Sequence, residues 1–301
     1  MKILITGATG FVGKTLIPNL LNSGFNEVGI VVRSVEKAKN LFGALDLTII
    51  ESNKDMRNNI ISYGPDIVLH MAALFNTKDD ENSATQLIES NITFGTLILE
   101  AISKTNCKYF VNIGTFSEFL YGGGVYSPNN FYSASKSAFR SIIKYYQLSS
   151  NFKWINIVLY SPYGRNNDSK KVIDYLIDTL NSTKPIDFSL GEQVLDFIHV
   201  DDIADFFISL FSQINKIENK YIQFHLGTGI GHSIREVGTI IEKVFDKKIN
   251  ANWGGLPYRK LDPMHVVAPI GKNLEILGWK AKIELENGIS ILKDDLKRNG
   301  K

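Results

Sequence analysis

The sequence predicts an α/β fold, in which a doubly wound parallel sheet is followed by a smaller mixed α/β lobe. The first observation is a short apolar run, residues 2–6, that leads through Gly7, Gly10 and Gly13 into an amphipathic helix ending near Gly24. The second is that apolar, β-branched segments alternate with helical segments through the first half of the chain. Strands that are joined by helices in this way form parallel sheets.

The glycine loop has the spacing of a dinucleotide site. Gly7 permits a tight turn, Gly10 lets the backbone approach a pyrophosphate, and Gly13 lets the helix pack on the strand. The N–H groups and the positive dipole end of the helix then favour phosphate. A strand-turn-helix that binds no cofactor would carry the same glycines. We expect the following loop residues to bind a dinucleotide: Gly7, Thr9, Gly10, Phe11, Val12 and Gly13.

The second strand, expected at Val28–Val32, ends at Arg33 and Ser34. An acidic residue at this position binds the adenosine ribose of NAD, whereas an arginine accommodates the 2′-phosphate of NADP. No acidic residue follows until Glu36. We therefore predict NADP as the cofactor, with contacts from Arg33 and Ser34, and keep NAD as the alternative. An Arg33 that only stacks on adenine would serve both cofactors.

Two further strands are expected at residues 47–50 and 66–70. Ala72 and Ala73 follow the second of these strands, and such small residues let the backbone lie close to a ligand. We expect both alanines to contact the cofactor. His70 is interpreted as a strand-end histidine rather than as a catalytic group.

A long helix is expected over residues 84–104, with Asn91 on its mostly apolar face. A buried amide needs a hydrogen-bond partner. We place Asn91 among the cofactor-binding residues.

The fifth strand is expected at residues 109–113 and ends at Thr115. The next helix carries Tyr132 and Lys136, which lie four residues apart and therefore on one face. A phenol has an ordinary pKa of about 10, and an ammonium one turn away favours the phenolate. The lysine can also hold a ribose, and the Thr115 hydroxyl can bond the same substrate oxygen as Tyr132. We predict Thr115, Tyr132 and Lys136 as catalytic residues, with Tyr132 and Lys136 also contacting the cofactor.

Gly7, Arg33, Ala72 and Thr115 each follow a predicted strand. The carboxyl ends of parallel strands share one edge of the sheet, and ligands of doubly wound sheets bind there. The sequence therefore predicts one site at this edge.

The second half of the chain is expected to form a smaller lobe. We predict a dinucleotide-binding domain over residues 1–165 and a substrate-binding lobe over 166–301, with residues 197–211 packing back on the first domain. Ser233, with Glu236 three residues later, predicts a capping box at the start of a helix.

Composition narrows the class of protein. The chain has 301 residues, 44% of them hydrophobic and 21% charged, as in ordinary globular proteins. A net charge of +2 without a long basic run disfavours nucleic acid as a partner. No apolar run is long enough for a membrane span, and we expect a cytoplasmic protein. The single cysteine, Cys107, excludes an intrachain disulfide and disfavours a metal site.

Ordered blocks of sequence resemble the extended short-chain dehydrogenase/reductases of the nucleotide-sugar epimerase/dehydratase family. The blocks are GATGFVG, HMAA, NIGT, YSASK, VLYSPYG, GEQVLDFIHVDDIA, LGTG and LGWKAKIELENGI, in family order over nearly the whole chain. The chain is most similar to the 4-ketoreductases of CDP- or dTDP-linked deoxyhexoses, the group of the CDP-paratose and CDP-abequose synthases. The resemblance implies an NAD(P)-dependent Rossmann oxidoreductase that acts on a nucleotide sugar.

The sequence departs from the family pattern at three places. Family dehydratases carry Asp-Glu after the catalytic threonine, whereas Phe116, Ser117 and Glu118 follow Thr115 here. Leu195 stands where many members have an arginine for the diphosphate, and Ser161 replaces a usual asparagine. Arg259 matches the family's other diphosphate arginine, and Arg165 or Lys170-Lys171 could assist it. The resemblance implies these substrate-binding residues: Phe75, Ser117, Glu118, Ser161 and Arg259.

We expect a reductase that delivers hydride from NADPH to the 4-keto group of a nucleotide-activated deoxyhexose. The enzyme alternative is an epimerase that retains NAD, and the non-enzyme alternative is a dinucleotide sensor. The helices expected at 84–104 and 131–149 carry a second apolar stripe, with Phe139, Ile142, Ile143, Tyr145 and Tyr146 in the latter. Family members commonly pair these helices, and we therefore expect a homodimer.

Overall fold

The computed structural model describes residues 1–76, 82–120, 124–167 and 169–298, and the chain divides into two compact units. The first unit comprises Met1–Val158 and Leu210–Phe224, and the second comprises Leu159–Ser209 and His225–Lys301. The division after Val158 precedes the boundary expected near residue 165. The segment that returns to the first unit is 210–224, whereas the sequence led us to expect 197–211.

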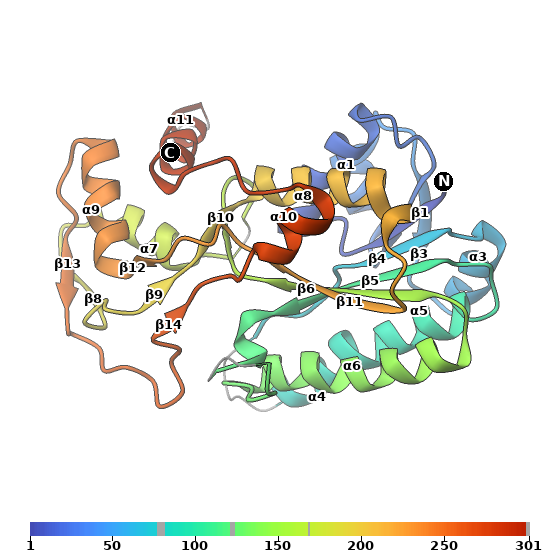
Figure 1. Cartoon of the computed structure of the whole chain (residues 1–301). Coiled ribbons are helices and arrows are strands. Elements are labelled where there is room, and N and C mark those ends of the chain that lie inside the picture. Colours follow the sequence, from blue (N-terminus) through green and yellow to red (C-terminus); the bar gives the residue numbers. More distant parts are fainter. Residues whose placement is uncertain (77–81, 121–123, 168, 299–301) are drawn as a thin grey trace. The chain divides into compact units, whose positions relative to one another are not determined.

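The first unit is built on a seven-stranded sheet with the strand order β11-β6-β5-β4-β1-β2-β3 (Figure 1). β1 pairs in parallel with β2 and with β4, β2 pairs with β3, and β4 pairs with β5. This is the doubly wound α/β fold that the sequence predicts. The strands are β1 (Ile3–Thr6), β2 (Val28–Val32), β3 (Thr48–Glu51), β4 (Ile67–His70), β5 (Tyr109–Thr115), β6 (Lys153–Leu159) and β11 (Tyr221–Leu226).

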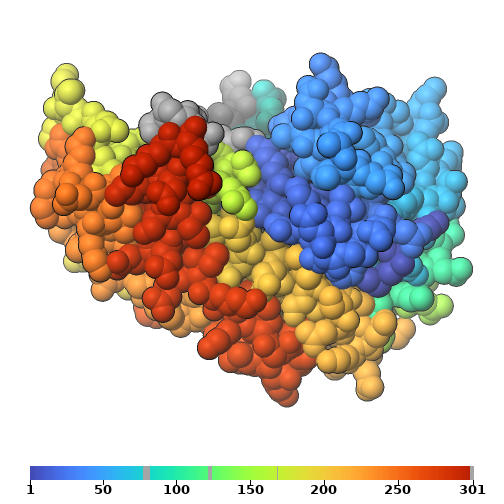
Figure 2. Space-filling view, turned by 90° about the horizontal axis from the view of Figure 1, so that it is seen from above, coloured from blue at the N-terminus to red at the C-terminus, as the bar shows by residue number. Residues whose placement is uncertain are grey.

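Helices cover both faces of this sheet. The helices are α1 (Phe11–Asn22), α2 (Val35–Phe42), α3 (Met56–Tyr63), α4 (Ser83–Ile88), α5 (Phe94–Ile102) and α6 (Phe131–Ser149). The atoms of α1 and α2, in blue, form the surface of this unit on the side seen in Figure 2. On the other face α3, α5 and α6 enclose a core in which Val68, Ile98, Phe110 and Phe139 are fully buried. Strands buried on both faces explain the uninterrupted apolar runs in the sequence.

The long helix expected over residues 84–104 is interrupted. Between α4 and α5, residues Glu89–Thr93 form a π-helix. A π-turn inserts an extra residue into the helical register, and such turns are frequent at functional sites. Asn91 lies within this turn and is fully buried. Hydrophobic periodicity could not reveal this interruption, because the helical segments on both sides of the one added residue keep apolar faces.

The described part of the second unit contains short strands and the helices α7, α9, α10 and α11, and it shares α8 with the first unit. The elements are β7 (Ser161–Tyr163), α7 (Val172–Thr179), β8 (Ile186–Phe188), β9 (Val194–Leu195), β10 (Phe197–His199), α8 (Val200–Gln213, which ends in the first unit), β12 (His232–Ser233), α9 (Ile234–Phe245), β13 (Ala251–Trp253), β14 (His265–Val266), α10 (Gly271–Leu277) and α11 (Leu285–Arg298). Leu176, Val237 and Ile289 are fully buried in its core. Ser233 and Glu236 form the capping box that the sequence predicts.

Two observations on the described residues bear on membranes and metal ions as binding partners. No helix among them is both long enough and apolar enough to cross a membrane. They contain no group of three or more His, Cys, Asp or Glu side chains placed to hold a metal ion.

Cys107 is buried, and burial raises the pKa of its thiol to about 12.

Gly13 gives a test of the packing of α1 on its loop. A Cβ atom at Gly13 would overlap the carbonyl group of Ala8, which is backbone and cannot rotate away. We expect Gly13→Ala to destabilise the protein by about 1–3 kcal/mol or more, as overpacked cores do. Urea unfolding followed by circular dichroism measures the change.

Gly271→Ala is the matched control. Nothing lies within 4 Å of a Cβ at Gly271, which is the first residue of α10. This variant should be as stable as the unmodified protein or slightly more so, because glycine costs about 0.5–1 kcal/mol relative to alanine inside a helix. Equal stability of the two variants would contradict the close packing of α1.

Candidate active site

The loop after β1 has the geometry that the glycine spacing predicts. Gly7 has a φ of +75°, and the Gly10 N–H donates to its carbonyl at 3.0 Å. Within the described loop, Gly10 caps α1 without a side chain, and the first turn of α1 contains no acidic residue. The positive end of the helix dipole is therefore not neutralised by a local carboxylate.

The loops after β1 and β4 approach each other closely. A Cβ on Gly7 would lie 2.7 Å from the backbone nitrogen of Ala72, so only glycine fits there. The Ala72 N–H donates to Thr6 Oγ1 at 3.1 Å, and Thr6 Oγ1 is 2.9 Å from His70 Nδ1. These contacts fix the backbone of Ala72 beside the glycine loop.

His70 is the core residue that the sequence analysis takes it to be. It is fully buried among the rings of Phe94, Phe110 and Phe139. Burial, helped by the charge of Lys136, lowers the pKa of His70 to about 3. The imidazole is therefore neutral at physiological pH, with one ring nitrogen protonated.

Thr115 ends β5 and begins a short 3-10 turn, η2 (Phe116–Glu118). The Thr115 hydroxyl lies 2.8 Å from that of Ser117, and it accepts the Ser117 N–H at 3.3 Å. The Glu118 carboxylate accepts the Thr115 N–H at 2.8 Å. Two hydroxyls thus lie together at the end of β5.

Tyr132 and Lys136 lie in the first turns of α6, which packs against η2. Asn130 caps this helix, because its side chain accepts the Ser133 N–H at 2.8 Å. The ring of Tyr132 is half-buried and meets the ring of Phe75 edge to face, 5.0 Å between centroids. Phe75 itself is 62% exposed and so presents its remaining surface outward.

Lys136 is a buried cation. Its side chain is 2% exposed, and it makes no hydrogen bond to any residue that the structure describes. Burial lowers the pKa of Lys136 to about 8, against the opposing effect of the Glu118 charge. A buried ammonium without a hydrogen-bond partner is costly, and hydroxyls of a bound ribose would satisfy it.

The pKa of Tyr132 is shifted in the direction opposite to the one expected from the sequence. Burial, followed by the negative charge of Glu118, raises the pKa of the Tyr132 phenol above its ordinary value. The spacing to Lys136 led us to expect a lowered pKa. Burial outweighs the ammonium because it penalises the phenolate directly. The phenol is consequently a protonated group, suited to donate a proton.

Asn91 connects the two halves of this site. Its Oδ1 accepts the Leu74 N–H at 2.7 Å, and its Nδ2 donates to Leu74 O at 3.1 Å and to Ser135 Oγ at 2.9 Å. Ser135 in turn donates to the carbonyl of Tyr132 at 2.7 Å. All the polar atoms of Asn91 are therefore used within the protein. It thereby links the loop after β4 to the start of α6, and a contact of Asn91 with the cofactor stays a prediction.

Glu118, which the resemblance assigns to the substrate-binding residues, is bound within the protein in this structure. Its carboxylate is fully buried and pairs with Arg140, with Oε2 2.6 Å from Nε and Oε1 3.1 Å from Nη2. Such a carboxylate is not accessible to a substrate. Arg140 was not predicted from the sequence, although Tyr132, Lys136 and Arg140 repeat at four-residue spacing on one helix face.

Arg33 and Ser34 follow β2 and are both exposed. The Ser34 hydroxyl accepts the Lys37 N–H at 3.1 Å and thereby caps α2. Its hydrogen remains available to a further acceptor, and the exposed Arg33 side chain makes no hydrogen bond or ion pair with the described residues. Thr9, Phe11, Val12 and Ala73 are partly exposed to solvent around the same loops.

The second unit holds the remaining predicted residues. Ser161 lies on β7, where its N–H donates to Asp196 O at 3.0 Å, and Arg259 is exposed in the loop before β14. Arg165 and Lys170 are paired with Asp201 and Asp178. Arg259 therefore has the less engaged side chain for an anion.

Asp196, next to the atypical Leu195, has a structural task. Its carboxylate accepts the backbone N–H groups of Thr228, Gly229 and Ala268 at 2.8, 2.9 and 3.1 Å. The carboxylate is fully buried. It joins three segments of the second unit and does not face solvent.

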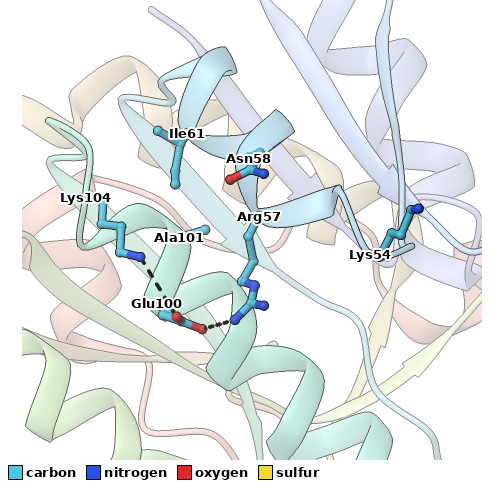
Figure 3. Close-up of a pocket in the computed structure, with 7 residues that line it drawn as sticks. All are labelled: Lys54, Arg57, Asn58, Ile61, Glu100, Ala101 and Lys104. Carbon is cyan, nitrogen blue, oxygen red and sulfur yellow. Dashed lines mark hydrogen bonds and ion pairs between the residues drawn. The ribbon is translucent and has the colours of Figure 1, made fainter.

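A pocket of about 240 Å³ lies between α3 and α5 (Figure 3). Glu100 pairs there with Arg57 at 2.7 Å and approaches Lys104 at 4.0 Å. None of the predicted site residues lines it, and its charged side chains are largely exposed and satisfied by one another. We do not assign it to the active site.

The residues of the first unit fit a bound dinucleotide. The close approach at Gly7, the uncapped start of α1 and the unpartnered ammonium of Lys136 are the features that such a ligand requires. The glycine loop and the start of α1 would hold the pyrophosphate, and Lys136 a ribose. A nicotinamide, once bound, supplies the hydride chemistry.

Comparisons with known proteins agree with this geometry. Residues 3–226 match the NAD dependent epimerase/dehydratase family. The chain is 28% identical to the CDP-abequose synthase of Yersinia pseudotuberculosis, over 94% of this chain and 97% of that protein. It is 27% identical to a UDP-glucose 4-epimerase of Pisum sativum, with 95% and 92% covered.

A solved structure shows the same fold. The UDP-glucuronic acid 4-epimerase of Bacillus cereus, in complex with UDP-glucuronic acid and NAD, matches with a TM-score of 0.86 at 22% identity, over 99% of this chain and 100% of that one. The family match includes the glycine loop, Thr115, Tyr132 and Lys136. The chain therefore belongs to the NAD dependent epimerase/dehydratase family, and with it to the NAD(P)-dependent enzymes.

Proposed function

We propose that the protein reduces the 4-keto group of a CDP- or dTDP-linked 4-keto-6-deoxyhexose with NADPH. Nucleotide sugars are the substrate class because the relatives are named CDP-abequose synthase and UDP-glucose 4-epimerase. One observation carries the choice of reduction. Thr115, Tyr132 and Lys136 are all present, while Glu118, the carboxylate after Thr115, is buried against Arg140. These residues thus include a proton donor, but the carboxylate that could act in the elimination of water is not accessible.

The chain's own groups have distinct parts in this reaction. The Tyr132 phenol, kept protonated by burial, donates its proton to the carbonyl oxygen as hydride reaches the carbon. Thr115 donates a hydrogen bond to the same oxygen. The Lys136 ammonium binds the ribose hydroxyls and stabilises the developing charge. Phe75, with its exposed ring against Tyr132, would cover the sugar. Ser117, Ser161 and Arg259 are the proposed further contacts to the nucleotide sugar.

Cofactor consumption tests the reaction. Purified protein should oxidise NADPH stoichiometrically when it is given a CDP- or dTDP-4-keto-6-deoxyhexose, measured by the loss of nicotinamide absorbance. Tyr132→Phe should lower kcat by about 10²–10⁴-fold, the usual contribution of a positioned proton donor, and keep the affinity for NADPH. Tyr145→Phe, on the exposed face of the same helix, is the matched control and should retain activity.

Two outcomes would replace this proposal. Interconversion of a UDP-hexose without net change in nicotinamide absorbance would establish a 4-epimerase, the activity named for the pea and Bacillus cereus proteins. Binding of NADPH without turnover of any nucleotide sugar would instead favour a dinucleotide sensor.

Arg33 supports NADP as the cofactor. Its guanidinium is exposed at the end of β2, where a carboxylate would repel a 2′-phosphate. A charge-assisted contact contributes about 1.5–3 kcal/mol, which is about ten- to a hundredfold in affinity. We expect kcat/KM for NADPH to exceed that for NADH by this factor. Arg33→Ala should remove most of the preference and leave the use of NADH nearly unchanged.

Equal kcat/KM values for the two cofactors in the unmodified enzyme would contradict this assignment. Arg33 would then stack on adenine, a contact that serves NAD and NADP equally.

We also propose a homodimer formed through α4, α5 and α6. Phe139 and Ile143, expected in the second apolar stripe, are fully buried within the subunit. Tyr145 and Leu148 on α6 are 65% and 75% exposed, and Ile88 on α4 is 43% exposed. Symmetric dimers are the commonest oligomers, and these side chains form the apolar surface that a second copy would cover.

Sedimentation velocity at micromolar concentration tests the dimer. The unmodified protein should sediment as a dimer and Leu148→Glu as a monomer. Leu190→Glu replaces another exposed leucine, which lies in the second unit, and should leave the dimer intact. A monomeric unmodified protein would exclude this interface.

A further inference from the structure

The Glu118–Arg140 pair is a pair of opposite charges inside the first unit. Glu118 is fully buried and Arg140 is 2% exposed. Removal of two charges from water is expensive, and a buried pair repays that cost only with excellent geometry. Here the guanidinium contacts both carboxylate oxygens, donates from Nη1 to Gln223 Oε1 at 2.9 Å, and lies 5.2 and 5.3 Å from the ring centroids of Phe119 and Tyr126.

The backbone of β5 makes room for this pair. A Cβ on Gly114 would lie 2.7 Å from Arg140 Nη2 and 2.7 Å from Glu118 Oε1. Glycine at this position therefore admits the two side chains beside the end of the strand. The pair lies directly against the residue that precedes Thr115.

Glu118 ties Thr115 to α6. One carboxylate oxygen accepts the Thr115 N–H at 2.8 Å. The other accepts from Arg140 Nε and from the Ser137 hydroxyl at 3.3 Å, both on α6. Because Tyr132 and Lys136 lie on the same helix, one carboxylate sets the placement of Thr115 relative to both.

Glu118 also supplies charge to the site. The groups that act electrostatically with Lys136 are Glu118 on η2, Arg140 on α6 and the neutral His70 on β4. Glu118 raises the pKa of Lys136 and Arg140 lowers it, with the Glu118 effect the larger. Glu118 likewise raises the pKa of Tyr132. Its charge thus keeps both groups protonated.

We propose that Glu118, held by Arg140, is a positioning residue of the active site, which fixes Thr115 through its backbone amide and provides the negative charge that keeps the buried Lys136 an ammonium. Its part in reduction rests on the proposed function. Its effect on Lys136 does not, because the binding of a dinucleotide alone reports the charge of that lysine.

Three variants separate charge from packing. Glu118→Gln keeps the shape and an acceptor for the Thr115 N–H but removes the negative charge. Arg140→Met removes the positive charge. The double variant Glu118→Gln/Arg140→Met replaces both charges by neutral side chains of similar size, a change that is often tolerated in buried pairs. Glu100→Gln is the matched control, since it removes an exposed carboxylate of the same unit.

The measurement is the dissociation constant of NADPH and of NADH between pH 6 and 10, followed by nucleotide fluorescence, with circular dichroism as the check of folding. Affinity should weaken as the pH rises through the Lys136 pKa of about 8. In Glu118→Gln this midpoint should move to lower pH by about one unit or more, the size expected for loss of a close opposite charge. Arg140→Met should move it to higher pH.

The double variant should move the midpoint to lower pH by less than Glu118→Gln does, and Glu100→Gln should not move it. Shifts of this sign and order cannot come from packing damage alone, which would weaken binding equally at every pH. Folded variants whose midpoints coincide with that of the unmodified protein would overturn the proposal. A double variant that fails to fold would also count against it, because the pair would then serve folding instead of the site.

The same pH profile of kcat/KM with the sugar nucleotide extends the test. Its basic limb should shift with the binding midpoint, because loss of the Lys136 charge weakens cofactor binding in both measurements. If no 4-keto sugar nucleotide is reduced, the proposed function fails, while the binding profiles still decide the role of Glu118.

Discussion

The active site depends on keeping one cation, the Lys136 ammonium, in the interior of the first unit. A buried ammonium loses its hydration, which lowers the pKa of Lys136 to about 8. Glu118 offsets part of this cost through its charge, and Arg140 offsets the cost of burying Glu118. Lys136, Glu118 and Arg140 are thus three charges of alternating sign on η2 and α6, and each offsets part of the cost of burying its neighbour. Removal of Arg140 leaves the buried Glu118 carboxylate without its ion-pair partner.

Neutral hydrogen bonds fix the other side of the site. Thr6 contacts both His70 and the Ala72 backbone, and Asn91 contacts both Leu74 and Ser135. These bonds cross between segments that follow different strands and carry no charge, so they hold their geometry at any pH at which the protein folds. The positions of the loops are thus independent of the titration of Lys136. Only the charges of the site vary with pH.

Local sequence patterns predicted the helices and strands, but they did not predict contacts between residues that lie far apart in the sequence. β1, β2, α1 and α6 follow from apolar runs, glycine spacing and caps, which act over a few residues. The partner of Glu118 lies 22 residues away on α6, and no spacing rule joins them. The π-turn around Asn91 and the raised pKa of Tyr132 likewise depend on burial. Burial arises only when the unit has folded. Asn91 and Glu118 were therefore singled out from the sequence, but the residues that they bind within the protein were not predicted.

The fold and the Thr115–Tyr132–Lys136 set do not by themselves distinguish a reductase from an epimerase. Both reactions move a hydride at one carbon and a proton at its oxygen, and the first unit provides for both with the same three side chains. An epimerase must also present the opposite face of the same sugar carbon before the second transfer. That freedom is set by the groups that grip the sugar and the diphosphate. Under the proposed function those groups would include Ser161 and Arg259 of the second unit, where the resemblance marks Leu195 and Ser161 as departures from the family pattern and Asp196 joins backbone segments. In the proposed reaction, the choice between one transfer and two would therefore depend on the residues around Ser161 and Arg259 and not on Tyr132, the proton donor.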